Sequence, residues 1–450
     1  MKYKLGSLFD GSGGFPLAGS LCGIEPVWAA EVEPYPIAVT RSRFPSMKHL
    51  GDISKINGAD IEPVDIITFG SPCQDLSVAG KRAGLKHEAN GDDETTRSGL
   101  FMEAVRIIKE MREATNGTSP TYALWENVPG AFSSNKGEDF RIVCEELIKI
   151  VEPTAVMPSV PQGGWAYADS YCGNGWSLAY RVFDAQYWGV PQRRRRIHLV
   201  LDLRGERARE VLFEREGVRG YFAEGGTPWK ATAGDAVCVT ETADCEAVGV
   251  DLYNFAVTGD IAATLNANSG QSANHAGPTV MEQYLFENHS QDSRYRGPLD
   301  VCPMLPAQLG TGGNNQPFVV QEGVIPIHDY VVRRLTPTEC ARLQGFPDDW
   351  AHPDVKDSLT DEEYLFWLEV RNTHAAINGK ATKDYTKAQM LTWYGNLHTD
   401  SAEYKMWGNG IALPPALYCM QGIADALGGG QEVAPQTAKK VAVRKVVRKG

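Results

Sequence analysis

The segment DIITFGSPCQDLS, residues 65–77, places a cysteine directly behind an apolar run and a Gly-Ser-Pro turn. Such a run is typical of a buried strand, and in open parallel sheets ligands bind at the carboxyl ends of the strands. Pro72 fixes its own φ and biases Ser71 toward extended geometry, so the loop that presents Cys73 should be stiff. The segment alone leaves two interpretations of Cys73 open: a nucleophile at the sheet edge, or a buried structural thiol.

Three other strand-like runs also end in residues that suit a ligand site. Residues 5–9 lead into a loop at 10–15, whose glycines let the backbone approach a ligand but lack the spacing of the dinucleotide fingerprint. Residues 27–30 end at Glu31, whose carboxylate suits a ribose diol, with a solvated surface glutamate as the alternative. Residues 122–125 end at Glu126, at the edge expected for Cys73. Together with the intervening helical stretches, these runs predict an α/β fold with a doubly wound, mostly parallel sheet.

The composition is ordinary for a soluble globular protein of two or three domains, with 450 residues, 42% of them hydrophobic and 22% charged. No apolar run approaches the roughly 18 residues of a membrane span, and the N-terminus does not resemble a signal peptide. Nine cysteines without a Cys-x-x-Cys pair indicate reduced thiols in the cytosol. No histidine pair sits at ligand spacing near Cys238 and Cys245, so we expect no metal site.

The chain also divides into four parts by composition. We expect residues 1–202, completed by 404–430, to form the α/β domain, and residues 203–330 to form a smaller, mainly β domain. In that second part an approximate repeat begins at Ile261 and again at Val301, and each copy contains a Gly/Asn-rich patch. Residues 331–403 should form a hinge and a helical insertion, with Thr336 and Glu339 as the capping box of its first helix. The basic tail at 431–450 has no apolar core and should be disordered.

In their order and spacing, these motifs resemble those of the DNA (cytosine-5)-methyltransferases of bacteria and bacteriophages. The resemblance covers most of residues 4–202 and 331–427, and is absent from 203–330, as expected for the variable target-recognition region of that family. Its blocks are the loop at 9–15, Glu31, Asp52-Ile53, Pro72-Cys73-Gln74, Glu126-Asn127-Val128, Gln192-x-Arg194-x-Arg196, the segments at 334–337 and 344–347, and Gly408-Asn409. The chain departs from the family where Asp10 and Trp407 replace apolar residues and Val32 replaces tryptophan.

The resemblance implies the fold of class I S-adenosylmethionine-dependent methyltransferases, with a catalytic and cofactor-binding α/β domain. Cytosine C5 is a poor nucleophile, but a thiolate that adds to C6 converts the ring into an enamine that can attack an electrophilic methyl group. Cys73 would be that nucleophile, Glu126 the acid at N3, and Arg194 the residue that contacts the base and orients the carboxylate. The residues implied for S-adenosylmethionine are Phe9, Asp10, Gly11, Gly13, Gly14, Glu31, Val32, Asp52, Ile53 and Asn409.

The implied partner is double-stranded DNA, whose target cytosine must be flipped out of the helix. The polar loop at 80–99 would close over the base, and residues 203–330 would form the target-recognition domain. Asparagine can read adenine in the major groove, although Gly/Asn clusters usually make turns; the candidates are Asn266, Asn268, Asn314 and Asn315. The net charge of −12 argues mildly against nucleic acid, but the basic runs at 193–196 and 439–449 would attract phosphates. We expect a cytoplasmic monomer of a bacterial cell or phage-infected host, acting in restriction-modification.

Three alternatives stand beside this interpretation. A tRNA cytosine-5 methyltransferase would share the catalytic blocks, but the long segment at 203–330 argues against it, because that branch of the family has a minimal recognition domain. A catalytically inactive DNA-binding relative is disfavoured by the intact Cys73, Glu126 and Arg194. A nicotinamide-dependent oxidoreductase would explain the glycine loop and Glu31, but not the Pro-Cys-Gln block or the arginine run.

Overall fold

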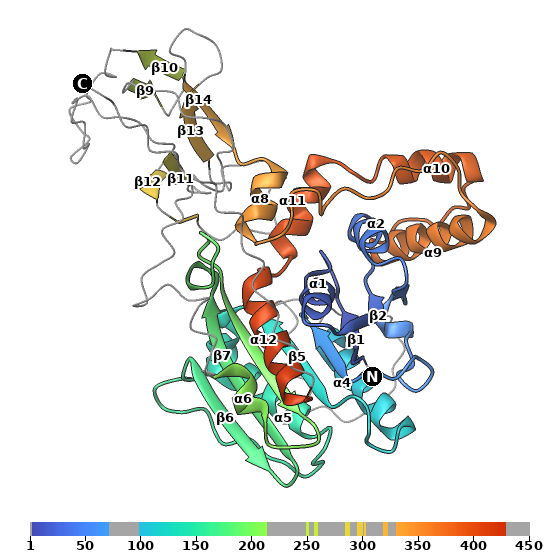
Figure 1. Cartoon of the computed structure of the whole chain (residues 1–450), viewed down its shortest axis with the longest axis vertical. Helices are drawn as coiled ribbons and strands as arrows, with labels where there is room; N and C mark the ends of the chain where they lie inside the picture. Colours follow the sequence, from blue (N-terminus) through green and yellow to red (C-terminus); the bar gives the residue numbers. More distant parts are fainter. Residues whose placement is uncertain are drawn as a thin grey trace, which may run out of the picture.

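The computed structural model describes residues 2–71, 99–213 and 330–428, together with 249–251, 256–259, 284–288, 295–299, 301–302 and 318–322. Its main body is an eight-stranded sheet with the strand order β3-β2-β1-β4-β5-β8-β7-β6 (Figure 1). The strands are β1 (Lys4–Leu8), β2 (Glu25–Ala30), β3 (Lys48–His49), β4 (Ile66–Phe69), β5 (Tyr122–Asn127), β6 (Ala168–Gly173), β7 (Trp176–Asp184) and β8 (Arg195–Asp202). Strands β1 to β5 pair in parallel, whereas β8, β7 and β6 extend the sheet antiparallel beyond β5.

The order of the parallel strands reverses at β1. Strands β2 and β3 lie on one side of β1, and β4 and β5 lie on the other. In open α/β sheets this switch point marks the crevice in which ligands bind, outside the carboxyl ends of the strands. The glycine loop follows β1 and the Gly70-Ser71 pair follows β4, so both begin at this crevice. The predicted doubly wound, mostly parallel sheet is therefore confirmed.

Helices cover both faces of the sheet because successive residues of its strands point to opposite faces. In β5, Leu124 packs into one core and Trp125 into the other. The first core includes α1 (Gly14–Leu21), α6 (Ala208–Leu212) and α12 (Leu413–Ala426). Helix α6 also contacts β7 and α12, so it packs with the main sheet although it follows the domain boundary expected at residue 202. The second core includes α4 (Leu100–Ala114) and α5 (Glu138–Ile148). Short 3₁₀ turns complete the loops: η1 (Ile53–Lys55), η4 (Pro129–Phe132), η5 (Ser134–Gly137) and η6 (Ala185–Tyr187).

The segment after residue 335 is helical, as predicted. Its helices are α8 (Pro337–Leu343), α9 (Asp361–Ile377), α10 (Lys387–Gly395) and α11 (Asp400–Asn409). Thr336 Oγ1 accepts from Glu339 N, and Glu339 Oε2 accepts from Thr336 N, so the predicted capping box of α8 is confirmed. Helices α9 and α10 project beside α2 (Pro34–Arg43) (Figure 1). There Trp367 and Met390 pack against Ile37 and Ala38 of α2.

The described strands between residues 249 and 334 form two small antiparallel sheets. One pairs β9 (Gly249–Asp251) with β10 (Ala256–Gly259). The other has the order β12-β11-β13-β14 and contains β11 (Tyr284–Asn288), β12 (Tyr295–Leu299), β13 (Phe318–Glu322) and β14 (Tyr330–Arg334). This agrees with the mainly β part predicted from the sequence. The candidate base-reading residues Asn266, Asn268, Asn314 and Asn315, most of the loop at 80–99 and the basic tail lie outside the described residues.

Two further observations concern the described part of the chain as a whole. No helix in it is both long and apolar enough to cross a membrane. Its cysteines Cys22, Cys144, Cys172, Cys302, Cys340 and Cys419 are free thiols.

Candidate active site

The carboxylate of Glu126 lies at the carboxyl end of β5 and forms an ion pair with Arg196, with 3.0 Å between Oε1 and Nε. Each side chain keeps only 11% of its exposure, so solvent and salt screen this pair weakly. His198 lies opposite Glu126 in the antiparallel register of β5 and β8. Burial, together with the charge of Arg196, lowers the pKa of His198 to about 3. The ring is therefore neutral near pH 7, and Arg196 supplies positive charge beside Glu126.

The end of β4 is tied to the end of β5 through Ser71. Asn127 Nδ2 donates to the carbonyl oxygen of Ser71 at 3.0 Å, and Trp125 Nε1 donates to Ser71 Oγ at 3.3 Å. Asn127 Oδ1 accepts from Val128 N at 2.8 Å, which fixes the orientation of the amide. Cys73 follows Ser71 by two residues and lies outside the described residues. The backbone that leads to Cys73 is therefore anchored to the strand that carries Glu126.

Gly70, the first residue after β4, lies beside the carboxylate of Glu126. A Cβ atom at Gly70 would lie 3.4 Å from Glu126 Oε2, in van der Waals contact with it. The backbone at the start of the Gly-Ser-Pro turn therefore lies directly beside the Glu126 carboxylate.

The four consecutive arginines do not all face the same way. Arg193 and Arg195 are exposed, whereas Arg194 is buried and Arg196 nearly so. Arg194 Nη2 donates to the carbonyl oxygens of Gly408 and Gly410, at the C-terminal end of α11, and its backbone N–H donates to Asp184 Oδ1 at 3.1 Å. The ion pair that the structure gives Glu126 is thus with Arg196, two residues beyond the arginine expected to orient the carboxylate. Of the four arginines expected to form a phosphate-facing strip, only Arg193 and Arg195 are exposed.

The glycine loop after β1 adopts left-handed backbone conformations. Phe9 has φ 56°, Gly11 φ 55° and Gly13 φ 76°, so two of these positions favour glycine on conformational grounds alone. Packing adds a second reason, since a Cβ atom at Gly14 would come within 2.5 Å of the Ile411 side chain. The loop therefore requires glycine for its own shape and for its contact with the segment after α11.

Glu31, at the end of β2, receives three backbone hydrogen bonds. Its Oε2 accepts from Gly11 N at 2.8 Å, and its Oε1 accepts from Val32 N at 2.7 Å and Glu33 N at 2.9 Å. Burial raises the pKa of Glu31, while these amides oppose the rise. Because a carboxylate offers about four acceptor positions, Oε2 retains capacity for a further donor such as a ribose hydroxyl.

Asp10 is the most unusual group of the loop. Both of its carboxylate oxygens are buried, and no described residue hydrogen-bonds them in ordinary geometry. Burial raises the pKa of Asp10 to about 8; the nearby Ser7 hydroxyl opposes this rise and the charge of Glu31 adds to it. A buried acceptor without a donor is costly, so the position favours either a protonated carboxyl or a cationic ligand.

The remaining residues expected at the cofactor have separate environments. Asp52 caps η1, since its Oδ1 accepts from Ser54 N at 3.0 Å and from Ser54 Oγ at 2.8 Å. Ile53 is buried in the core beneath the sheet. Asn409 is exposed at the last position of α11, between the two glycines whose carbonyls hold Arg194. Gly11 of the loop donates a hydrogen bond to Glu31, and Gly14 lies against Ile411, two residues beyond Asn409. The loop, Glu31 and the end of α11 are therefore close to one another.

Relatives with similar sequences are named as methyltransferases. The chain is 28% identical to a DNA N-6-adenine-methyltransferase of Escherichia phage P1 over 97% of its own length, and it spans 63% of that protein. It is 27% identical to the type II methyltransferase M.Bsp6I of Bacillus sp. (strain RFL6), with 78% of this chain and 90% of the relative covered. It is 28% identical to the type II methyltransferase M1.ScrFI of Lactococcus lactis subsp. cremoris, covering 83% and 77%.

Solved structures agree on the fold. The Dnmt2 methyltransferase of S. pombe superposes with a TM-score of 0.51 at 15% identity, covering 95% of this chain and 99% of that one. The methyltransferase EhMeth of Entamoeba histolytica superposes with a TM-score of 0.52 at 11% identity, with the same coverage. The family model of the C-5 cytosine-specific DNA methylases matches residues 3–151 and 170–362. The chain therefore belongs to the C-5 cytosine-specific DNA methylase family.

Proposed function

We propose that this protein transfers a methyl group from S-adenosylmethionine to C5 of cytosine in duplex DNA, through a covalent bond between Cys73 and C6 of the base. The observation that carries the proposal is the buried Glu126–Arg196 pair at the end of β5, beside the Ser71 backbone that leads to Cys73. An acid and a thiol on adjacent parallel strand ends are what an attack on an electron-poor ring requires.

The chain's residues would act in the following order. The Cys73 thiolate forms the S–C6 bond while Glu126 donates a proton to N3, so the electron pair of the C5–C6 double bond becomes available at C5. Once C5 carries the methyl group, a base removes the C5 proton, the S–C6 bond breaks and the thiolate leaves. This elimination restores the C5–C6 double bond, and Glu126 takes back the N3 proton, which leaves neutral 5-methylcytosine. Arg196, rather than Arg194, would orient the Glu126 carboxylate, because Arg196 makes the ion pair.

The residues around the glycine loop fit S-adenosylmethionine, which when bound supplies an electrophilic methyl group and carries positive charge on its sulfonium and amino groups. The buried carboxylate of Asp10 suits a cationic ligand, and the free acceptor capacity of Glu31 Oε2 suits a ribose hydroxyl. Phe9, Gly11, Gly13 and Gly14 shape the loop. Val32, Asp52, Ile53 and Asn409 would complete the cofactor site by the family resemblance.

Recognition of the DNA sequence we assign to residues 203–330. The small antiparallel sheets formed mainly by this part lie outside the eight-stranded sheet, and their strands carry none of the residues expected to be catalytic. At Cys302 this part meets the arginine run: Arg193 N donates to the Cys302 carbonyl oxygen at 2.7 Å, and Cys302 N donates to that of Pro191 at 2.7 Å. Exchanging residues 214–330, which leaves α6 in the core of the main sheet, with the matching part of a relative of known site should change the methylated sequence, and an active exchange with unchanged preference would contradict this assignment.

A second activity deserves a test because one relative, aligned over 97% of this chain, is named as a DNA N-6-adenine-methyltransferase. Methylation of an exocyclic amine proceeds by direct attack of nitrogen on the methyl group and has no use for a thiol adduct. The Pro-Cys-Gln block and the Glu126–Arg196 pair therefore favour cytosine C5.

The experiment that separates the two is nucleoside analysis. Unmethylated duplex DNA is incubated with the purified protein and isotope-labelled S-adenosylmethionine, digested, and examined by mass spectrometry. We expect label in 5-methyldeoxycytidine. Label confined to N6-methyldeoxyadenosine, or label incorporated into tRNA but not into DNA, would overturn the proposal.

A further inference from the structure

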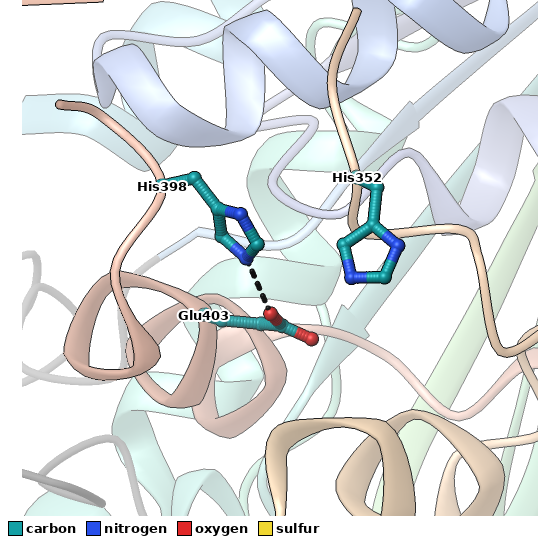
Figure 2. A group of neighbouring side chains, drawn as sticks. All are labelled: His352, His398 and Glu403. Atoms are coloured by element: carbon teal, nitrogen blue, oxygen red, sulfur yellow. Dashed lines mark hydrogen bonds and ion pairs between the residues drawn. The ribbon is translucent and has the colours of Figure 1, made fainter. Parts of the chain in front are cut away.

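Two histidines and a glutamate from separate segments meet beside the helical insertion. His352 lies in the turn after α8, His398 lies between α10 and α11, and Glu403 lies in the first turn of α11. Their potential ligand atoms all lie within 4.8 Å of one another. Figure 2 shows the His398 ring directed at the Glu403 carboxylate, with the His352 ring on the other side of it. None of these residues belongs to the catalytic blocks.

The carboxylate of this cluster is buried and held from both sides. Glu403 keeps 4% of its side-chain exposure, and its Oε2 lies 2.9 Å from His398 Nε2. Its Oε1 accepts from Trp407 Nε1, one helical turn further on, at 3.1 Å. Trp407 is fully buried. Its indole therefore fixes the orientation of the carboxylate and leaves Oε2 directed toward the histidines.

Tyr35, which lies outside the proposed ligand set, positions both histidines. The Tyr35 ring stacks on the His398 ring, with 5.5 Å between centroids and 2° between planes. The Tyr35 hydroxyl donates to the carbonyl oxygen of Ala351 at 2.6 Å, which holds the backbone immediately before His352. The centroids of the two imidazoles are 5.3 Å apart. Tyr35 and Trp407 thus do for this cluster what supporting residues do around metal ligands.

We propose that His352, His398 and Glu403 form a binding site for a divalent transition-metal ion, with Zn²⁺ as the best fit. Two imidazoles and one carboxylate are a common three-residue ligand set for Zn²⁺, with water in the fourth position, whereas Mg²⁺ and Ca²⁺ prefer oxygen ligands. Tetrahedral bonds of about 2.0–2.1 Å would place ligand atoms roughly 3.3 Å apart. Small rotations of the two exposed imidazole rings would close the cluster to that size, with the ion between His398 and Glu403.

Such an ion would join the two ends of the helical insertion to α11. His352 and His398 bracket the segment that contains α9 and α10, and Glu403 belongs to α11, at whose C-terminal end the Gly408 and Gly410 carbonyls lie. Binding to the folded state alone would stabilise this junction, because the ligands are far apart in the unfolded chain. Sequence spacing gave no sign of the site, since its histidines flank an insertion instead of forming a short motif. The alternative is that His398 and Glu403 form an ion pair without a metal ion, in which case His352 has no role in the cluster.

The test measures metal binding by the chelator-treated full-length protein. Zn²⁺ and Co²⁺ are titrated by equilibrium dialysis and by thermal unfolding, with Mg²⁺ in a parallel series. Because the nine cysteines could bind metal, the Co²⁺ absorption spectrum reports whether sulfur is a ligand. The variants are His352→Ala, His398→Ala and Glu403→Gln. His374→Ala is the matched control, since His374 lies nearby on α9, pairs with Glu33 at 3.6 Å and is outside the cluster.

We expect one ion per chain, no sulfur charge-transfer band for that ion, and an unfolding midpoint that rises with Zn²⁺ or Co²⁺ but not with Mg²⁺. The affinity should fall by about tenfold or more in each cluster variant, as removal of even a supporting residue costs about that much, and stay unchanged in His374→Ala. Both histidines are exposed, so their alanine variants should fold, which the midpoint without metal checks. Absence of binding by the wild type, or equal affinity in the wild type and His352→Ala, would overturn the proposal.

Discussion

The two ends of the candidate active site differ in how the charge of their buried carboxylate is balanced. At the end of β5, Glu126 pairs with Arg196, and Asn127 holds the Ser71 carbonyl. In the loop after β1, the carboxylate of Asp10 is buried with no hydrogen-bond donor among the described residues. The carboxylate at the catalytic end is therefore balanced by a cation of the protein itself, whereas the carboxylate at the cofactor end is a site that a cationic ligand would complete.

This difference corresponds to two roles, catalysis at the end of β5 and cofactor binding in the loop after β1. Groups that must act on a reacting base benefit from fixed positions, because preorganised dipoles cost no rearrangement during the reaction. A group that waits for a charged ligand can instead be kept protonated by burial until the ligand arrives. The comparison predicts that substitutions at the β5 end lower the rate constant, and that substitutions in the loop change cofactor affinity and its pH dependence.

The largest effect should come from Glu126→Gln. Glutamine keeps the shape of the side chain but cannot donate the N3 proton, and general acid catalysis is worth about two to four powers of ten. Methylation at saturating DNA and cofactor should fall by that factor, with cofactor affinity unchanged. Glu152→Gln is the control, because the Glu152 carboxylate accepts a hydrogen bond from Trp176 and does not lie at the carboxyl end of β5. A Glu126→Gln rate within a few-fold of wild type would place the acid elsewhere.

The two buried arginines give the next test. Arg196→Gln removes the positive charge paired with Glu126, so kcat should fall roughly ten- to a hundredfold, which corresponds to about 1.4–2.7 kcal/mol in the activation barrier. Arg194→Gln removes the donor to Gly408 and Gly410, so it should mainly lower the unfolding midpoint and raise the KM for the cofactor. The reverse pattern, with kcat lost in Arg194→Gln alone, would return the catalytic role to Arg194.

A smaller and pH-dependent effect is expected for Asp10→Asn. The pKa of Asp10 is about 8 when folded and about 3.9 when unfolded, so between these values the folded state holds a proton that the unfolded state has released. Its contribution to stability is full below pH 4 and is lost as the pH rises through 8. The variant should lack this component, which unfolding curves at pH 5 and pH 8 would reveal.

The same variant tests the cofactor end of the comparison. Asp10→Asn should weaken S-adenosylmethionine binding by about tenfold, since it removes the charge partner of a cation. Wild-type affinity should increase from pH 6 to pH 8, as binding favours the ionised carboxylate, and the variant's affinity should not. Calorimetric titration at the two pH values measures both. Parallel pH profiles for the wild type and the variant would show that Asp10 does not meet the cofactor.

The smallest effect should follow from Asn127→Ala, which frees the Ser71 carbonyl without touching the reacting groups. A buried hydrogen bond contributes about 1 kcal/mol, so we expect about a fivefold lower kcat and unchanged cofactor affinity. Single-turnover methylation measures the rate of the chemical step, and cofactor titration measures the affinity separately. A larger change in affinity than in kcat would mean that the tie between β4 and β5 serves the cofactor end.

The sequence predicted the architecture well because hydrophobic runs, glycine loops and caps are local signals. Strand β4, the loop after β1 and the Thr336–Glu339 capping box all follow from neighbouring residues. The choice between Arg194 and Arg196 depends on which strand lies beside β8 and in which register, and that pairing is not local. The same limit hid the His352–His398–Glu403 cluster, which the packing of the insertion brings together.

The most direct test of the account is the covalent intermediate. Duplex DNA with 5-fluorocytosine at the target position should form a denaturation-resistant adduct with the wild-type protein in the presence of S-adenosylmethionine, because fluorine at C5 prevents the final elimination. Peptide mapping should place the adduct on Cys73, and Cys73→Ala should form none while still binding DNA. No adduct with the wild type, an adduct on another cysteine, or continued cytosine methylation by Cys73→Ala would contradict the account.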